Sequence, residues 1–400
     1  MKESPRLIVV GAGPVGTIAA LAAVQAGFDV TLVEEASEID KNPRAATTHP
    51  STLEMISRVG LIDDFIAEGL IAREFQFWDR ASGTLVATFD HDLLRDETPF
   101  PFVVQTEQHK LVRLGLERLR SHGVSLRLGS RVTSCSQNAE TVYINVEKAG
   151  ETETLSGDWL IAADGGRSTI RKSFDIEFEG YTWPERFLVL TVLDDLNAMV
   201  GYCFRNYLAD SSEWANVFKV AGDDYRGRWR VVVPVRESEN DADALSLKNA
   251  VDRLNRVHQH DYQLVHRNLY RVHQRVAATF RAGRVLLAGD AAHVNNPIGG
   301  LGLNFGIHDA MDAIESLSAV ALRGEDESLL DRYANRRRAL NIRFVQEQTV
   351  ANKKRLEETD QKSRLANFET LRATAADPAR AKAFLMRSSL IESVREAAAM

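Results

Sequence analysis

The amino-acid sequence predicts an α/β fold, in which a parallel sheet is interrupted by strand-rich insertions and is followed by a helical C-terminal segment. Three short, continuously apolar runs predict buried parallel strands, and each is followed by glycine or by an Asp-Gly pair: Leu7–Val10, Trp159–Ala163 and Val285–Ala288. Residues 72–104 alternate apolar and polar positions, and residues 179–235 are also strand-rich. Both stretches indicate antiparallel strands. From about Ser328 onward the sequence is predominantly helical in character.

The N-terminal stretch predicts a complete βαβ unit. A strand over Leu7–Val10 leads into an Ala- and Leu-rich helix over Thr17–Ala26, and a second strand covers Val30–Val33. Gly27, directly after the helix, is typical of a C-cap, because glycine adopts the left-handed conformation without steric cost.

The remaining elements follow in chain order. We expect a loop over 42–50, helices over 51–59, 108–121, 242–257 and 309–322, and strands over 125–128, 132–135, 142–147, 187–192, 200–204, 217–220 and 229–235. Because nucleotide-type motifs and strand-rich stretches interleave, we expect a discontinuous nucleotide-binding domain. Its predicted pieces are 1–74, 102–177 and 270–330, with a substrate-binding β-sheet domain over 75–101 and 178–269, and a helical region over 331–400.

Composition excludes several classes of protein. The 400 residues carry a formal net charge of −7, which argues against a broad nucleic-acid-binding surface. Two cysteines cannot form a disulfide framework and fit a reducing compartment. No run approaches the roughly 18–20 apolar residues of a membrane-spanning helix, and the Met1–Pro5 start lacks a signal-peptide pattern. We therefore expect a cytoplasmic protein without nucleic-acid or membrane partners.

A glycine motif follows the first predicted strand and precedes the first predicted helix. Gly11, Gly13 and Gly16 have the GxGxxG spacing, with Val15 inside the motif. In this context the glycines permit a tight turn, close approach of a pyrophosphate and close helix–strand packing. The helix N-terminus supplies amide donors and a positive dipole for phosphates.

Two acidic residues, Glu34 and Glu35, end the second strand. A carboxylate at this place accepts hydrogen bonds from a ribose diol and repels a 2′-phosphate. The site is therefore predicted to hold the adenosine of FAD or NAD, and the motif does not separate these two.

A further acidic residue and a glycine-rich turn favour a flavin. Asp290 comes directly after the Val285–Ala288 strand, and Pro297–Asn304 forms a turn that opens the next helix. The Asp290 carboxylate can bind sugar-alcohol hydroxyls, and the turn can present backbone N–H groups to a ring carbonyl. Both features match the ribityl chain and the isoalloxazine ring of a flavin.

Three motifs, Gly11–Gly16, Asp164-Gly165 and Gly289-Asp290, resemble those of the flavoprotein aromatic hydroxylases. These are single-component monooxygenases typified by para-hydroxybenzoate hydroxylase and the phenol hydroxylases, and the resemblance covers roughly residues 6–340. It implies a Rossmann-like FAD-binding domain of the glutathione-reductase type, an inserted β-sheet substrate domain and a C-terminal helical segment.

The resemblance also implies the cofactor-binding residues. Arg44 would lie along the FAD, Gln105 would reach its ribityl or phosphate region, and Arg228 would face the flavin; a structural salt bridge is the alternative for each arginine. Asp164 would touch both FAD and the nicotinamide cofactor, or would be a strand-end turn residue. The full implied set is Gly11, Gly13, Val15, Gly16, Glu34, Glu35, Arg44, Gln105, Asp164, Arg228, Gly289, Asp290, Pro297, Gly300, Gly302, Leu303 and Asn304.

The implied reaction uses NADH or NADPH to reduce FAD, and O₂ then forms a flavin C4a-hydroperoxide that hydroxylates an electron-rich aromatic ring. A base near neutral pKa would help to deprotonate the ring substituent. His293 is the first candidate, and Tyr202 or Tyr207 the second; a structural histidine and core tyrosines are the alternatives. Pro297 would sit beside the flavin ring.

Departures from the family pattern leave other functions open. Leu301 replaces a lysine of some members, and Asn216–Arg228 shows no clear carboxylate-binding Ser/Arg pair. A reductase, a halogenase, an antibiotic-inactivating monooxygenase and a flavin-binding protein without turnover remain alternatives, although no Trp-x-Trp-x-Ile supports a halogenase. The sequence leaves the aromatic substrate, the choice of nicotinamide cofactor and a possible homodimer open.

The histidine-rich stretch after residue 257 does not predict a metal site. We expect these histidines to straddle a helix end and a loop without Cys or carboxylate at ligand spacing: His258, His260, His266 and His273.

Overall fold

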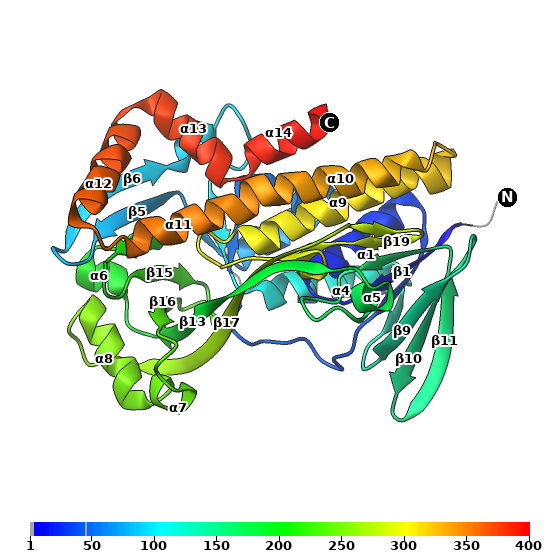
Figure 1. Ribbon diagram of the computed structural model, residues 1–400, viewed down its shortest axis with the longest axis horizontal. Helices are drawn as coiled ribbons and strands as arrows, with labels where there is room; N and C mark the ends of the chain where they lie inside the picture. The colour runs from blue at the N-terminus through cyan, green and yellow to red at the C-terminus, as the bar shows by residue number, and fades with distance from the viewer. Residues whose placement is uncertain (1–3, 45) are drawn as a thin grey trace.

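A computed structural model describes residues 4–44 and 46–400 of the chain (Figure 1). The expectations for Met1–Glu3 and Ala45 therefore lie outside the described residues. The rest confirms the predicted α/β class with a helical C-terminal segment.

A six-stranded sheet contains the three apolar runs side by side. Its order is β18-β19-β12-β1-β2-β8, and all neighbours are parallel except β18 and β19. The strands are β1 (Arg6–Val10), β2 (Asp29–Val33), β8 (Ser125–Arg127), β12 (Trp159–Ala162), β18 (Arg281–Ala282) and β19 (Val285–Leu287). Parallel strands buried on both faces explain why these runs are continuously apolar.

Helices α1 (Pro14–Ala26), α4 (Gln108–Ser121) and α9 (Leu301–Arg323) share one hydrophobic core with this sheet. The antiparallel strands β9 (Arg131–Gln137) and β10 (Val142–Lys148) contribute to the same core, and β11 (Glu151–Gly157) pairs with β10. Helix α1 ends at Gly27 in the left-handed conformation (φ 105°), as predicted.

An eight-stranded sheet forms the second layer, in the order β20-β17-β13-β16-β15-β14-β5-β6. Only the β14–β5 pair is parallel. The strands are β5 (Glu74–Asp79), β6 (Thr84–Asp90), β13 (Phe178–Val192), β14 (Arg205–Ala209), β15 (Ala215–Val220), β16 (Arg228–Val235), β17 (Leu264–Ala277) and β20 (His293–Val294). The long strands β13 and β17 run from the region of the first sheet into the second (Figure 1). The expected domain boundary between residues 269 and 270 falls inside β17.

Side chains of the second sheet alternate between two environments. On β13, Leu188 and Leu190 pack in a core that α8 (Leu247–Val257) covers, whereas Phe187 and Val189 face the opposite side. This period of two places every second side chain of the sheet toward the interior of the molecule between the layers.

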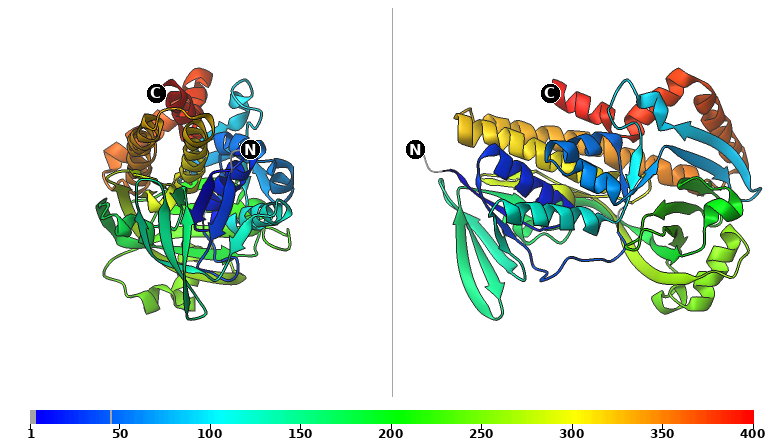
Figure 2. Two further views of the ribbon diagram at one scale, coloured as in Figure 1. Left: turned by 90° about the vertical axis from the view of Figure 1, so that its right-hand side faces the viewer. Right: turned by 180° about the vertical axis from the view of Figure 1, so that it is seen from behind.

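The C-terminal segment is helical, as predicted. Helix α10 (Ser328–Asn341) lies beside α9 and continues through a π-helical turn, η3 (Ile342–Gln346), into α11 (Glu347–Glu357) (Figures 1 and 2). Three more helices follow, namely α12 (Gln361–Ala376), α13 (Pro378–Ser388) and α14 (Ile391–Ala399). Phe368 of α12 and Leu385 of α13 pack in one cluster with residues of β5 and β6. Within residues 4–44 and 46–400, none of the helices combines the length and apolar character that spanning a bilayer requires.

Some local predictions were wrong. Residues 200–204 are not a strand, because Asp195 caps α6 (Leu196–Val200) and Gly201 ends it in the left-handed conformation. The helix over 242–257 is divided into α7 (Asp241–Ala244) and α8, since Ser246 caps the second helix. His266 and His273 lie on β17 and not in a loop.

The sequence reading also missed several short elements. They are β3 (Thr47–Thr48), α3 (Ile62–Ala67), β4 (Leu70–Ala72), η1 (His91–Leu94), α5 (Thr169–Ser173) and η2 (Gly289–Ala291). Strand β7 (Val103–Gln105) begins within the stretch 72–104 where antiparallel strands were predicted, and it pairs antiparallel with β3 and β4. Helix α2 (Pro50–Arg58) agrees with its prediction.

A buried carboxylate, Asp309 of α9, joins four segments near the centre of the molecule. Its Oδ1 accepts a hydrogen bond from Arg337 Nε of α10 at 2.7 Å. Its Oδ2 accepts from Gly289 N of η2 at 3.1 Å and lies 2.7 Å from His293 Nε2 of β20. The side chains of Asp309, Arg337 and His293 are all buried. Asp309 therefore holds the turn after β19 against α9 and α10.

We predict that Asp309→Asn lowers the free energy of unfolding by about 3–5 kcal/mol, because the buried Arg337 would lose its 2.7 Å partner and keep, among the described carboxylates, only Asp312 at 4.0 Å. Urea unfolding followed by circular dichroism measures the change. Asp158→Asn is the matched control, since Asp158 forms an exposed pair with Arg6 that is worth at most about 1 kcal/mol. Equal losses in the two variants would contradict the role assigned to Asp309.

Candidate active site

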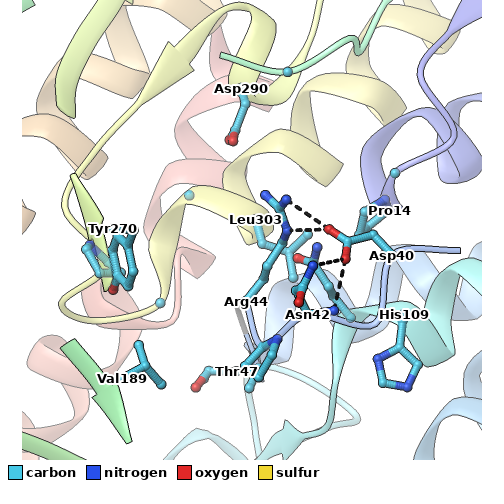
Figure 3. A pocket seen from close by; sticks show the side chains of 18 of the residues that line it. Pro14, Asp40, Asn42, Arg44, Thr47, His109, Val189, Tyr270, Asp290 and Leu303 are labelled. Carbon is cyan, nitrogen blue, oxygen red and sulfur yellow. Dashed lines mark hydrogen bonds and ion pairs between the residues drawn. The ribbon is translucent and has the colours of Figure 1, made fainter. Parts of the chain in front are cut away.

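One cavity of about 830 Å³ lies between the two sheets (Figure 3). One end is lined by the N-terminus of α1, the end of β2 and residues of the segments 36–44 and 46–47. The other end is lined by the inward face of the eight-stranded sheet. Between them lies the turn from Val294 to Leu303 that leads into α9.

The three motif glycines have different surroundings. A Cβ on Gly11 would lie 2.3 Å from Ala163 O, and one on Gly16 would lie 1.8 Å from Gly11 O. Gly13 lines the cavity, and a Cβ there would meet no atom within 4 Å. Gly11 and Gly16 therefore allow the β1–α1 turn to pack, whereas Gly13 leaves open space for a ligand.

Val15, next in the motif, lines the cavity and packs against the turn after β19. A Cβ on Gly289 would lie 2.9 Å from Val15 Cγ2, and one on Gly306 would lie 2.8 Å from the same atom. Gly289 therefore lets η2 approach α1 and does not itself line the cavity.

The two acidic residues at the end of β2 differ. Glu34 lines the cavity, and its carboxylate is held by the backbone N–H groups of Ala12 at 2.6 Å and Ala36 at 2.9 Å. Glu35 is exposed and is not among the lining residues. The geometry thus presents a fixed carboxylate beside the glycine turn, where a ribose diol would bind.

The turn before α9 carries free backbone donors. Gly299 (φ 107°) and Gly300 (φ 68°) both need the left-handed region, and α9 begins without a side-chain cap. Its first-turn N–H groups are therefore available to a ligand with partial negative charge. The predicted residues that line the cavity here are Pro297, Gly300, Gly302 and Leu303.

Asn304 holds this turn from behind and does not line the cavity. Its Oδ1 accepts from His49 N at 2.8 Å, and its Nδ2 donates to Thr47 O at 2.8 Å and to Gly300 O at 2.6 Å. Since the side chain is fully buried, its amide positions the turn.

A buried amide network holds the other side of the turn. Gln274 of β17 donates to Gln346 Oε1 of the π turn at 2.7 Å and accepts from Asn296 N at 3.0 Å. Gln346 in turn donates to Val294 O at 3.2 Å. Sequence reasoning missed this network, because its members are far apart in the chain and no motif marks them.

Asp290 and Arg44 lie at the cavity, whereas Arg228 does not. The Asp290 side chain points into the cavity (Figure 3), and desolvation raises the pKa of its carboxyl. Arg44 pairs with Asp40 at 2.9 Å (Figure 3). Arg228 pairs with Asp224 at 2.8 Å away from the cavity, in agreement with the salt-bridge alternative. Arg230, two residues further along β16, lines the cavity instead.

Gln105 and Asp164 lie behind the cavity wall. Gln105 is fully buried and accepts from Thr47 Oγ1 at 2.7 Å, while its Nε2 has no hydrogen-bond partner among the described residues. Asp164 accepts from Ile170 N at 3.1 Å, and desolvation raises its pKa. Its neighbours Gly165 and Gly166 line the cavity.

Of the candidates for the substrate base, the structure brings only Tyr207 to the cavity. His293 is buried in the ion-paired node of Asp309, so its ring cannot reach a ligand there. Tyr202 lies on the opposite side of the eight-stranded sheet, packed on Trp78 with ring centroids 5.2 Å apart. Burial raises the pKa of its hydroxyl to about 12.

The sheet end of the cavity is aromatic with a few polar groups. Phe187, Trp214, Tyr207 and Tyr270 form the apolar walls, and Phe187 meets Trp214 edge-to-face at 4.9 Å between ring centroids. The polar residues that sequence reasoning missed are Arg205, Asn216, Arg230 and Asn268. Alternation along β14 and β16 was the signal that could have found the two arginines.

These features fit FAD. The open space at Gly13 and the fixed Glu34 carboxylate suit the adenosine diphosphate half. The Asp290 carboxyl and the uncapped N-terminus of α9 suit the ribityl chain and flavin ring.

We predict that Gly13→Val folds but is purified without FAD, because the new side chain would fill the space of the pyrophosphate. Gly13 has φ −66°, so valine causes no backbone strain. Absorbance of the purified protein measures FAD content, and circular dichroism reports folding. Gly16→Ala is the contrasting variant and should not fold, since its Cβ would overlap Gly11 O. A Gly13→Val protein with full FAD content would refute the assignment of this space.

Comparisons with known proteins agree with this geometry. A family model described as FAD binding domain matches residues 5–348. Para-nitrophenol 4-monooxygenase of Pseudomonas sp. strain WBC-3 is 34% identical over 96% of this chain and 96% of its own. The 6-hydroxy-3-succinoylpyridine 3-monooxygenase of Pseudomonas putida is 32% identical over 89% of this chain and 90% of its own.

Solved structures extend the likeness to three dimensions. The p-nitrophenol 4-monooxygenase of Pseudomonas putida DLL-E4 has a TM-score of 0.91 at 31% identity, covering 98% of this chain and 99% of that chain. A complex of aklavinone-11 hydroxylase with FAD and aklavinone has a TM-score of 0.75 at 25% identity, over 89% and 70% of the two chains. This chain therefore belongs to the FAD binding domain family, among the FAD-dependent aromatic hydroxylases that its motifs resemble.

Proposed function

We propose that this chain is a single-component monooxygenase that takes electrons from NADH or NADPH and hydroxylates a phenol or a hydroxy- or amino-heteroaromatic ring with O₂. The observation that carries the proposal is one continuous cavity. It joins the glycine turn and Glu34 at one end to the aromatic side chains of the eight-stranded sheet at the other, across the Pro297–Leu303 turn. A substrate ring in that chamber would lie against the flavin end of FAD. The names of the relatives, which act on a nitrophenol and a hydroxypyridine, support this substrate class.

Bound FAD supplies hydride acceptance and oxygen activation, and the protein supplies binding, orientation and electrostatics. We assign ribose binding to Glu34 and ribityl binding to Asp290. The N-terminal amides of α9 would stabilise negative charge on the flavin edge. Phe187, Trp214 and Tyr270 would hold the substrate ring and exclude water.

Tyr207 is the residue to which we assign contact with the ring substituent. It is the one sequence-predicted base candidate among the lining residues, and its hydroxyl accepts a hydrogen bond from Arg205 at 3.1 Å. We also propose FAD-binding pieces 1–74, 102–177 and 270–330 and substrate-binding pieces 75–101 and 178–269, with β17 shared between them because the 269/270 boundary falls inside it.

We predict that a phenol or hydroxypyridine accelerates reduction of the bound flavin by NADH or NADPH. Stopped-flow absorbance under anaerobic conditions, with a panel of phenols, anilines and hydroxypyridines, measures the bleaching of the flavin band. Aerobic turnover with ¹⁸O₂ and mass spectrometry then tests for one labelled oxygen in the ring. The Gly13→Val protein, without FAD, controls for contaminating reductases.

Two results would contradict this function. If FAD is bound but no compound changes the bleaching rate and no product carries ¹⁸O, a flavin-binding protein without turnover becomes the better reading. If a compound is reduced or halogenated without labelled oxygen, the chain is a related flavoenzyme with different chemistry.

A further inference from the structure

A buried arginine projects from the central part of the eight-stranded sheet into the cavity. Arg205 and Tyr207 are alternate residues of β14, so both side chains point to the same face. Arg205 is only 6% exposed and lines the cavity together with Ile298 and Gly299 of the turn before α9. Its Nη2 donates to Tyr207 Oη at 3.1 Å, and its guanidinium carbon lies 5.1 Å from the centre of the Phe75 ring.

The charge of Arg205 has no counter-ion in the described part of the chain. No carboxylate oxygen there lies within 4.0 Å of its guanidinium nitrogens, and Nη1 has no hydrogen-bond partner. Two other buried arginines have a counter-ion: Arg253 pairs with Glu213 and with Glu239, and Arg230 has Glu107 at 4.0 Å. Arg171 is buried without one in the described ranges, but its guanidinium donates to the carbonyl groups of Ala291 and Gly166. A guanidinium cannot shed its proton in a protein, so the isolated charge of Arg205 costs stability.

Two histidines near Arg205 do not add to its positive charge. Burial, and then the positive charge of Arg205, lower the pKa of His49 far below its usual value. The same two causes lower the pKa of His91 to about 3. Both histidines are therefore neutral at physiological pH, and the site keeps an unbalanced positive charge.

A small chamber of about 30 Å³ lies beside Arg205 and is closed by α11 and α13. Gln348 lines it, and Gln348 Oε1 has no partner among the described residues. A chamber of this size has room for one water. Water carries no charge, so the need for an anion remains.

We propose that Arg205 and Tyr207 form a binding site for an oxyanion carried by the aromatic substrate, either a phenolate or a ring carboxylate. Tyr207 Oη accepts from Arg205, which leaves its own hydrogen free to donate to the substrate oxygen. The aromatic walls hold the ring, and the positive charge of Arg205 pairs with the negative charge on the substrate oxygen. This inference rests on the proposed function, because it concerns the substrate of the same cavity.

Matched pairs of ligands test the site in the FAD-loaded protein. Para-nitrophenol is compared with para-nitroanisole, and para-nitrobenzoate with its methyl ester; in each pair only the first can carry an oxyanion. The flavin difference spectrum gives the Kd of each ligand. Calorimetry in buffers of different ionisation enthalpy gives the protons released when a neutral phenol binds as phenolate.

We expect Arg205→Met to weaken binding of the oxyanion ligand by about 10- to 100-fold, the range for losing a charge-assisted hydrogen bond, and to leave the neutral partner unchanged. Arg205→Lys should restore part of the affinity, and Tyr207→Phe should weaken it less than Arg205→Met does. If Arg205→Met weakens the binding of para-nitrophenol, and wild type releases protons when this phenol binds, the site holds a phenolate. If Arg205→Met weakens the binding of para-nitrobenzoate, the site holds a carboxylate.

Thermal stability without an aromatic ligand separates this role from a structural one. Arg205→Met should melt at or above the wild-type temperature, because it removes an unbalanced buried charge. Arg253→Met, which removes a paired buried charge away from the cavity, should melt well below it. A large loss of stability in Arg205→Met would count against the proposal. In that case Arg205→Lys, which keeps the positive charge, still allows the ligand affinities to be measured.

The inference would be overturned if wild type and Arg205→Met bound both oxyanion ligands with the same affinity. It would also be overturned if Arg205→Met weakened the binding of the neutral ligands as much as that of the oxyanion ligands. The proposed function would stand in either case, provided that a ring compound still accelerates flavin reduction. If no aromatic compound binds the wild type or accelerates reduction, the proposed function itself fails, and this inference with it.

Discussion

The molecule depends on one buried negative charge. Asp309 is inaccessible to solvent, so every lone pair that it presents must be satisfied by the protein. Arg337, Gly289 and His293 do this from three other segments of the chain. As a result the turn that carries Asp290 is hydrogen-bonded directly to α9, the helix whose N-terminus meets the cavity. Two elements that line the cavity are therefore fixed to each other through Asp309.

The turn between Val294 and Leu303 shows how such rigidity is transmitted. Backbone with two successive left-handed glycines is intrinsically adaptable. Here it is held by Asn304 on one side and by Gln274 and Gln346 on the other. These amides come from three elements, and none of them is near the others in sequence. A preorganised turn of this kind presents donors to a ligand without further ordering cost.

The sequence predicted what local periodicity and composition determine. The apolar runs of β1, β12 and β19 and the GxGxxG turn identified the sheet and the dinucleotide cradle, because burial on both faces leaves a clear pattern. Contacts between residues that are far apart in the chain leave no such pattern in the sequence. His293 looked like a base because it follows Asp290 closely, yet its partner is Asp309. Arg205 was missed because the neighbouring strand was misplaced to 200–204, where the Gly201 cap ends a helix.

The π turn at Ile342–Gln346 also sets the angular phase of the C-terminal region. Such a turn accommodates one extra residue within a continuous helix, and one residue corresponds to about 100° of rotation. The side chains of α11, including Gln348 beside Arg205 and Asn352 beside Gly299, face the small chamber in the phase that this residue sets. A relative with a one-residue gap here would turn a different helical face toward its substrate. A single insertion or deletion in this helix would therefore change which side chains of α11 line the small chamber, while the strands stay unchanged.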